Sequence, residues 1–350
     1  MHFASDNTAP VPPQVLDALA RANHGHAPAY GTDRLTAEAV DAIRRMLEAP
    51  RAAVALVPTG TAANALALAT LCPPWGAIYC HRHAHIEEDE CGAPEFYTGG
   101  AKLTLLDGEQ AKITPATLDA ALAEAGALGV HNVQRGAVSL TNVTERGAVY
   151  EPAEIAALSA VARAYDVPVH MDGARLANAV AATGASPAEL SWKAGVDALS
   201  LGGTKNGLMA AEAVVLFDPA RARELELRRK RAGQLFSKHR YLAAQFCAWL
   251  EDDLWCHLAR RANDAAARLA GGLGAMPGVQ LHGQARANMI FADLPRAVHR
   301  RLFEAGAHYY LTAPGASLSG PDHAPLSARF VTCWATSEAE VDEFLGVAAG

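Results

Sequence analysis

Between about residues 50 and 220, the hydrophobic positions of the chain follow two periodicities in turn. Short apolar runs with the length of buried strands alternate with longer segments in which apolar residues recur at the spacing of a helix. The predicted strands are 52–57, 77–80, 102–106, 137–143, 167–171, 196–201 and 212–217. The predicted helices are 61–71, 115–125, 152–165 and 186–194. This order favours right-handed crossovers and an α/β fold, with a mostly parallel sheet between layers of helices.

The pattern changes after residue 219. Helices are predicted over 219–232 and 240–268, and the rest of the chain mixes the strands 287–292 and 328–333 with the helices 296–305 and 337–348. A chain of 350 residues is long enough for two domains. We therefore expect an N-terminal segment over 1–20, a large domain over 21–244 and a smaller C-terminal α+β domain over 245–350.

Composition and charge exclude several classes of protein. Hydrophobic residues make up 51% of the chain, which excludes a mainly disordered protein. The net charge of -7 and the lack of a basic stripe argue against a nucleic-acid partner. No apolar run is long enough to span a membrane, so no membrane partner is expected. The six cysteines form no Cys-x-x-Cys pair and are typical of reduced thiols, which predicts a cytoplasmic location.

Ligands of open α/β sheets bind at the carboxyl ends of the strands, so these ends hold the candidate site residues. Thr59, Gly60 and Thr61 follow the first predicted strand and open a helix. The free N–H groups of such a turn bind anions, and Gly60 lets the backbone approach a phosphate. The alternative is a tight turn with a threonine N-cap. The turn lacks the lysine of a P-loop, which argues against nucleotide binding of that type.

Asp172 lies at the end of another predicted strand, and Arg175 follows on the same turn. A carboxylate buried there needs a cationic partner. The protonated ring nitrogen of a pyridine cofactor is one such partner. An ion pair between Asp172 and Arg175 is the alternative.

Lys205 differs from the other five of the six lysines, because it follows an apolar strand and has glycines around it. Most lysines lie on solvated surfaces. A lysine in a pocket can instead lose its charge and form a Schiff base with a carbonyl compound. The neighbouring Thr204 can add a hydroxyl to a phosphate site.

His81, His83 and His85 alternate along an extended segment that precedes Asp89 and Glu90. Three interpretations are open: a zinc site, one histidine stacked on an aromatic cofactor, or histidines on a polar surface loop. Because the sequence shows no matching second cluster of ligands, we expect no metal.

Arg329 alternates with apolar residues on a short predicted strand. An arginine that faces a pocket there can hold a carboxylate with two hydrogen bonds. The alternative is an ordinary arginine on an edge strand.

Taken in order, these motifs resemble the L-threonine aldolases, which are pyridoxal-phosphate (PLP) lyases of the fold-type I, aspartate aminotransferase-like superfamily. The resemblance runs from Ser5-Asp6 to Arg329-Phe330-Val331-Thr332 and so covers most of the chain. Between these two segments lie Ala29-Tyr30-Gly31-Thr32-Asp33, Pro58-Thr59-Gly60-Thr61, Ala84-His85-Ile86, Asp172-Gly173-Ala174-Arg175 and Thr204-Lys205. The segments 202–207 and 235–240 look like the low-specificity subgroup found in pseudomonads. The resemblance implies a three-layer large domain like that of PLP-dependent transferases.

The resemblance also implies roles for the residues at matching positions. Lys205 matches the lysine that forms the Schiff base with PLP, and Asp172 matches the aspartate on the ring nitrogen. His85 matches a histidine stacked on the ring, and Glu90 matches the acidic residue that follows it. The expected phosphate-binding residues are Thr59, Gly60, Thr61 and Thr204. The expected substrate-binding residues are Ser5, Tyr30, Arg175 and Arg329, with Arg175 also near the phenolic oxygen of the cofactor.

Two positions depart from the family pattern. Thr144 lies where many members carry a histidine, which leaves the general base open, with His85 as the leading candidate. Many members also have an arginine near position 238 that reaches the phosphate of a neighbouring subunit, and here Lys238 or Arg240 is expected to replace it. Family members share their sites between the subunits of a dimer, so a homodimer or a homotetramer is expected.

The sequence therefore predicts a carbon–carbon lyase that splits L-threonine, L-allo-threonine and other β-hydroxy-α-amino acids into glycine and an aldehyde. The alternative on the same fold is β-elimination, racemisation or transamination. Two alternatives lie outside this class: a non-catalytic α/β binding protein, and a metal-dependent hydrolase built on His81, His83, His85 and Asp89.

Overall fold

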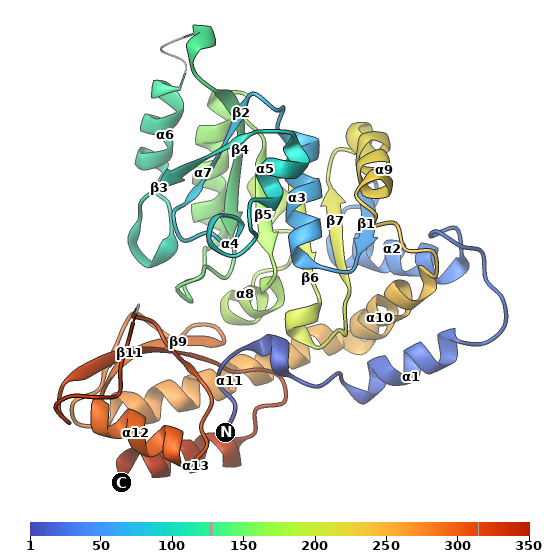
Figure 1. The fold of residues 1–350 in the computed structure, drawn as a ribbon. Coiled ribbons are helices and arrows are strands. Elements are labelled where there is room, and N and C mark those ends of the chain that lie inside the picture. The colour runs from blue at the N-terminus through green and yellow to red at the C-terminus, as the bar shows by residue number, and fades with distance from the viewer. Residues whose placement is uncertain (126–128, 314) are drawn as a thin grey trace.

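The computed structural model describes residues 1–125, 129–313 and 315–350. Its larger sheet has the strand order β1-β7-β6-β5-β4-β2-β3 (Figure 1). The bounds of these strands are β1 Ala53–Val57, β2 Gly76–His81, β3 Lys102–Leu106, β4 Gln134–Thr141, β5 Val169–Gly173, β6 Ala198–Gly202 and β7 Glu212–Leu216. A smaller sheet has the order β10-β11-β9-β8, with β8 Gln280–Leu281, β9 Met289–Pro295, β10 Tyr310–Leu311 and β11 Pro325–Val331.

Helices precede, separate and follow these strands. In the first two thirds of the chain they are α1 Pro13–Ala22, α2 Arg34–Met46, α3 Gly60–Leu71, α4 His85–Glu88, α5 Ala93–Thr98, α6 Pro115–Glu124, α7 Pro152–Ala164, α8 Leu176–Thr183 and α9 Ala222–Arg231. The later helices are α10 Arg240–Leu250, α11 Leu254–Gly274, α12 Arg296–Glu304 and α13 Glu338–Ala349. None of the helices in the described residues combines the length and the apolar character that crossing a membrane requires.

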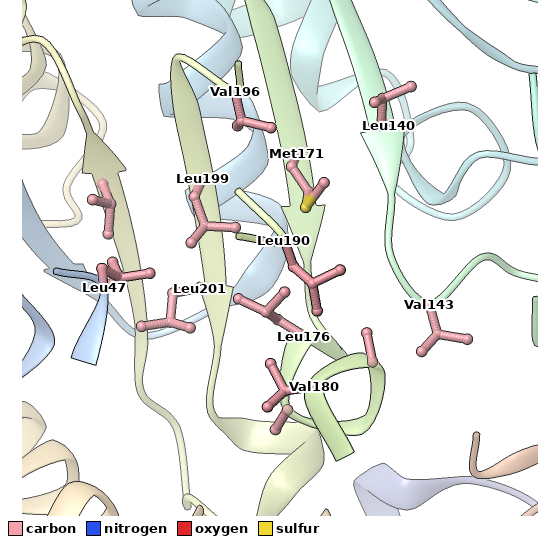
Figure 2. Close-up of a cluster of buried hydrophobic side chains, with 14 of the residues drawn as sticks. Leu47, Leu140, Val143, Met171, Leu176, Val180, Leu190, Val196, Leu199 and Leu201 are labelled. Atoms are coloured by element: carbon pink, nitrogen blue, oxygen red, sulfur yellow. The ribbon is translucent and has the colours of Figure 1, made fainter. Parts of the chain in front are cut away.

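The two faces of the larger sheet carry separate hydrophobic clusters. Successive residues of a strand point to opposite faces, so Leu199 joins one cluster and Ala198 the other. The first face, part of which Figure 2 shows around Met171, Leu199 and Leu201, packs against α1, α2, α6, α7, α8 and α10. The second face packs against α3 and α9. The three-layer α/β prediction is confirmed.

All strands of the larger sheet except β7 run in one direction. Strands β3, β2, β4, β5 and β6 pair in parallel along the sheet. Strand β7 is antiparallel to both β6 and β1, so β1 runs the same way as β6. The sheet is therefore mostly parallel, as predicted, and the carboxyl ends of its parallel strands meet at a single edge.

The smaller sheet has a core of its own, formed with the second half of α11 and with α12 and α13. The N-terminal Phe3 is fully buried in this core, and its backbone bonds to His308 and Val331. Helix α11 supports both cores, because Leu258 and Ala259 pack under the larger sheet while Leu269 and Leu273 pack under the smaller one (Figure 1). The domain boundary at 244/245 stays a prediction.

Two predicted helices were wrong in their extent. The segment 240–268 is interrupted at Asp252 and Asp253, whose positive φ angles of 49° and 53° end α10 and redirect the chain into α11. The segment 186–194 is turns followed by a short 3-10 helix at Trp192–Ala194. The helix of this region lies earlier, at α8, where consecutive residues from 176 to 180 are buried. Burial on all sides removes the periodic pattern that marks a helix in sequence.

Candidate active site

A cavity of about 480 Å³ opens at the carboxyl edge of the larger sheet, facing β9, β10 and β11 of the smaller one. It brings together five residues that the sequence predicted for the site: Ser5, His85, Arg175, Lys205 and Arg329. These side chains come from the N-terminal segment, from three loops at the sheet edge, and from β11. The site therefore depends on both parts of the fold.

Lys205 lies in a short 3-10 turn, Thr204–Asn206, directly after β6. The next residue anchors this turn, because the Asn206 side chain donates to the carbonyl of Trp255 at 2.7 Å and its own carbonyl accepts from the Trp249 indole at 2.9 Å. Among the described residues, the Lys205 ammonium has neither a hydrogen bond nor an ion pair. Burial and the nearby Arg175 lower its pKa. An amine that loses its proton readily is suited to act as a nucleophile.

Asp172, near the end of β5, is held by two hydrogen bonds. One carboxylate oxygen accepts from the Ala174 backbone N–H at 2.9 Å, and the other accepts from the Asn64 side chain at 2.9 Å. Burial opposes the charged form, but His85, Lys205 and these hydrogen bonds lower the pKa of Asp172. A negative charge is thus kept inside the sheet edge, where a cationic ring nitrogen would be stabilised.

Asn64 links Asp172 to a second acid, Glu90. The Asn64 amide donates to Glu90 at 2.8 Å, and the same Glu90 oxygen lies 2.8 Å from Nδ1 of His85. Burial raises the pKa of Glu90, and the hydrogen bond to Glu90 raises the pKa of His85. The contact between Glu90 and Nδ1 therefore fixes the orientation of the His85 ring and leaves Nε2 available in the cavity.

Glu145 is a third acid beside His85. One of its carboxylate oxygens accepts from the His85 backbone N–H at 2.7 Å. Burial and the charge of Asp172 raise the pKa of Glu145 to about 7. Near neutral pH this acid can therefore both hold and release a proton.

The side chains of His85, Glu90 and Asp172 offer ligand atoms within 4.8 Å of one another, which is compatible with a metal ion. This is not the metal set that the sequence suggested as an alternative. His81 lies 3.1 Å from the carbonyl of Gly108, and His83 lies 2.7 Å from Glu88. Glu90 contacts His85 directly, and the Asn64 amide bridges Glu90 and Asp172.

Arg175 is paired with Asp6 from the N-terminal segment. Its Nε and Nη2 donate to the two carboxylate oxygens at 2.6 and 3.0 Å, and Asn288 donates to the same carboxylate at 3.0 Å. Burial opposes the charge of Asp6, but Arg175 and Lys205 lower its pKa. The sequence left open whether Arg175 pairs with Asp172; its partner in the structure is Asp6.

The turn at Thr59, Gly60 and Thr61 combines the cap and the anion site that the sequence posed as alternatives. The Thr59 hydroxyl caps α3 by accepting from the N–H of Ala62 at 3.2 Å. The N–H groups of Gly60 and Thr61 have no acceptor in the described chain, and a Cβ on Gly60 would meet nothing within 4 Å. The buried hydroxyl of Thr204 lies beside the carboxylate of Glu212. These donors fit the phosphate of PLP.

Arg329 extends from β11 into the same cavity. Its Nη2 donates to the carbonyl of Ala4 at 3.3 Å, and its buried Nε has no hydrogen-bond partner in residues 1–125, 129–313 and 315–350. A free donor on a fixed guanidinium fits a carboxylate ligand. The structure thus favours the pocket interpretation of Arg329.

Eight predicted residues do not line this cavity: the five already described, Thr59, Gly60, Thr61, Asp172 and Thr204, and three others, Tyr30, Lys238 and Arg240. The backbone N–H of Tyr30 donates to the carbonyl of Ser237, and the ammonium of Lys230 lies 4.7 Å from the Tyr30 ring. Arg240 donates to the carbonyl of Gly25, while Lys238 is exposed. These residues form one surface region. The predicted contact of Lys238 or Arg240 with a neighbouring subunit's phosphate and the predicted substrate role of Tyr30 stay predictions.

Thr144, which replaces a histidine of many family members, is fully buried. Its hydroxyl donates to the carbonyl of Gln110 at 2.8 Å and accepts from the N–H of Ala148 at 3.1 Å. Its hydroxyl is thus used within the fold.

Sequence reasoning missed the supporting residues Asn64, Glu145 and Asn288 and the pairing of Asp6. Asn64 left one usable signal, because it is an amide within an apolar helix whose residues from 62 to 71 are all buried. Such a residue needs hydrogen-bond partners. Glu145 and Asn288 do not stand out as single polar residues within an apolar helix. Only the fold of the chain brings them to the site.

Comparison with known proteins places the chain in a class. Residues 2–295 match the family described as Beta-eliminating lyase, and the chain belongs to this family. Within it the chain groups with the low specificity L-threonine aldolases: it is 43% identical to the enzyme of that name from Pseudomonas aeruginosa and 41% identical to that of another Pseudomonas species. Both alignments cover 97% of this chain and 95% of the relative.

Solved structures agree. A threonine aldolase from Leishmania major superposes with a TM-score of 0.91 at 29% identity, covering 99% of this chain and 98% of that one. A serine palmitoyltransferase from Sphingomonas wittichii superposes with a TM-score of 0.71 over 100% of this chain and 86% of that one. At 18% identity, this second likeness shows the fold alone.

The buried ion pair yields a prediction for stability. Asp6→Asn leaves Arg175 buried without its counter-charge, so the free energy of unfolding of the cofactor-free protein should fall by about 3–5 kcal/mol. Because the pKa of Asp6 is lowered on folding, its stabilisation is present above the unfolded pKa, near ~4, and is lost as the pH falls through the folded value. Urea denaturation at several pH values should show the two proteins converging below about pH 4.

Asp342→Asn is the matched control, because Asp342 forms a two-bond pair with Arg268 on the surface. That variant should change stability little, since exposed pairs are screened by water. Equal losses in the two variants would contradict the account of the Asp6 pair.

Proposed function

We propose that this chain is a PLP-dependent aldolase that cleaves L-threonine, L-allo-threonine and other β-hydroxy-α-amino acids to glycine and an aldehyde. The observation that carries the proposal is the combination of Lys205, Asp172 and His85 at one edge of the sheet. An ammonium without a described partner, a buried carboxylate and an oriented imidazole line the same cleft or border it. The comparisons with threonine aldolases support this choice of substrate class.

The residues present fit PLP, and each has a task. The backbone N–H groups of Gly60 and Thr61, with the hydroxyls of Thr59 and Thr204, would hold its phosphate at the start of α3. Lys205 would hold its carbonyl carbon covalently. Bound PLP supplies an electron sink for the bond between Cα and Cβ of the substrate.

Asp172 would face the ring nitrogen and keep a proton on it, because the lowered pKa of Asp172 disfavours transfer of that proton to the carboxylate. The fixed geometry given by Asn64 and the Ala174 N–H means that this charge needs no rearrangement during the reaction.

Arg329 and Ser5 would bind the α-carboxylate of the substrate. Arg329 lines the cleft and its Nε has no hydrogen-bond partner among the described residues, while Ser5 precedes the Asp6 that fixes Arg175. This anchoring sets the direction in which the β-substituent of the substrate extends.

His85 would take the proton of the β-hydroxyl through Nε2, directly or through water, as the bond between Cα and Cβ breaks. Its Nδ1 is held by Glu90, so that proton loss and gain at Nε2 are coupled to a buried acid. The Lys205 amine, which lines the same cleft, would return a proton to Cα and complete glycine.

The role of Lys205 is tested by Lys205→Ala. We expect loss of the visible absorbance of the lysine-linked cofactor and a fall in threonine cleavage of several orders of magnitude, because the covalent attachment is gone. Lys193→Ala is the control, since Lys193 pairs with Glu48 on the surface. Unchanged absorbance after dialysis in amine-free buffer would refute the assignment.

The role of His85 is tested by two substitutions. Phenylalanine keeps an aromatic face but accepts no proton, so His85→Phe should retain PLP while turnover of threonine falls ~10²–10⁴-fold. Asparagine keeps a hydrogen bond but loses the ring, so His85→Asn should also weaken PLP binding. Turnover and PLP affinity are measured for both. Near wild-type turnover in His85→Phe would show that His85 only stacks on the cofactor and is not the general base.

The family description favours a second candidate reaction on the same site, β-elimination. Racemisation and transamination use the same machinery. Direct assay of glycine and aldehyde separates these reactions from an aldolase, because none of the three breaks the bond between Cα and Cβ.

We also propose a homodimer or homotetramer with shared sites and a cytoplasmic location. The assembly rests on Tyr30, Lys238 and Arg240, which lie together away from the cavity of their own chain. The location rests on the six cysteines, none of which forms a disulfide.

The assembly is tested by a double variant, Lys238→Ala with Arg240→Ala. It should bind PLP more weakly, because a phosphate would lose its cationic contacts from the second subunit. Light scattering gives the assembly state, and titration with PLP gives the affinity. A fully active monomer at the assay concentration would end the proposal of shared sites.

A further inference from the structure

A second cavity, of about 380 Å³, adjoins the active-site cleft. The two cavities share four lining residues: His83, Arg146, Phe291 and Thr312. The walls of the second cavity come from the loop at Gly108 and Gln110 on the large sheet and from β9 and β11 on the small one. The space therefore continues from the reacting groups outward between the two sheets.

Arg146 is a positively charged residue that lines both cavities. It follows Glu145, whose carboxylate binds the backbone of His85, so its position is tied to the catalytic loop. Its guanidinium carbon lies 5.5 Å from the ring centre of Phe291, which restrains the side chain. No carboxylate and no hydrogen-bond acceptor pairs with it in the described part of the chain.

Most of the acids near Arg146 have other partners. Glu88 lies 2.7 Å from His83, and Glu145 is bound to the N–H of His85. Behind the second cavity, Asp293 pairs with His282 at 2.9 Å and accepts from the Ser327 hydroxyl. Asp89 lines the first cavity together with Arg146 but forms no ion pair with it. Arg146 thus has no paired acid among the described residues where the two cavities meet.

We propose that Arg146 receives an anionic group, a carboxylate or a phosphate, at the far end of the substrate's β-substituent. This inference rests on the proposed aldolase function and names the substrate class more narrowly: β-hydroxy-α-amino acids whose aldehyde product is negatively charged. Arg329 on β11 holds the α-carboxylate, and Arg146 holds the second anion from the opposite wall.

Cleavage of a substrate with a distal anion involves the same bond changes as cleavage of threonine. The bond between Cα and Cβ breaks, its electron pair goes to Cα, and a proton there completes glycine. The β-hydroxyl loses its proton and Cβ becomes the carbonyl carbon of the aldehyde. The distal anion takes no part in these steps, and no oxidant or reductant is needed.

The test compares charged substrates with uncharged counterparts of similar shape. L-threo-β-hydroxyaspartate is paired with β-hydroxyasparagine, and the phosphate ester of 4-hydroxy-L-threonine is paired with 4-hydroxy-L-threonine. We expect kcat/KM of the PLP-loaded enzyme to favour at least one charged member by roughly 10- to 100-fold, the effect of a hydrogen bond to a charged group. The pair that shows the preference identifies carboxylate or phosphate as the anion.

Arg146→Met should abolish this preference while L-threonine cleavage stays close to wild type. Arg146→Lys keeps the charge and should retain part of the preference, without the two-bond geometry of arginine. Arg51→Met is the matched control, because the exposed Arg51 precedes β1 at the opposite edge of the sheet.

The outcomes separate cleanly. Equal kcat/KM within both pairs in the wild-type enzyme overturns the inference, and so does a preference that survives Arg146→Met. If kcat/KM falls equally for every substrate, threonine included, in both Arg146 variants, Arg146 is the ligand of the α-carboxylate. That result also overturns the inference. Failure of the wild-type enzyme to cleave L-threonine at all would instead reject the proposed function.

Discussion

The burial of opposite charges at the carboxyl edge of the large sheet is the constraint on which the rest of the site depends. An ion removed from water without a partner costs several kcal/mol, so each buried charge there requires another group at a fixed place. Asp6 is matched by Arg175, and Asp172 by the amide of Asn64 and a backbone N–H. These pairs determine which segments must come together before any ligand binds.

The same constraint ties the two sheets to each other. Asp6 belongs to the N-terminal segment, whose Phe3 is buried in the small core, yet its carboxylate reaches Arg175 beyond β5. Asn288, just before β9, binds the same carboxylate. A short N-terminal segment thus carries both a hydrophobic anchor and a charged one, and each anchor lies in a different part of the fold.

Most charged groups at the sheet edge are paired, but a few hydrogen-bond donors there have no acceptor in the described chain. The Lys205 amine, the Nε of Arg329 and the N–H groups at Gly60 and Thr61 are polar groups that the described chain does not pair. Buried polar groups are nearly always paired in folded proteins. Lys205 and Arg329 line one cleft, and Gly60 and Thr61 follow β1 at the same edge of the sheet, so these donors indicate a binding site for a phosphate, a carbonyl carbon and a carboxylate.

The mostly parallel sheet, the turn at Gly60 and the strand-end positions of Asp172 and Lys205 could be predicted from the amino-acid sequence. They follow from local periodicity and from residues placed directly after apolar runs. The pairing of Arg175 with Asp6 and the link that Asn64 makes between Asp172 and Glu90 could be found only in the folded chain. Asp6 and Arg175 are 169 positions apart, and Asn64 and Asp172 are 108 apart. No local pattern records such a pairing, since the free energy that selects it comes from desolvating both groups together when the chain closes around them.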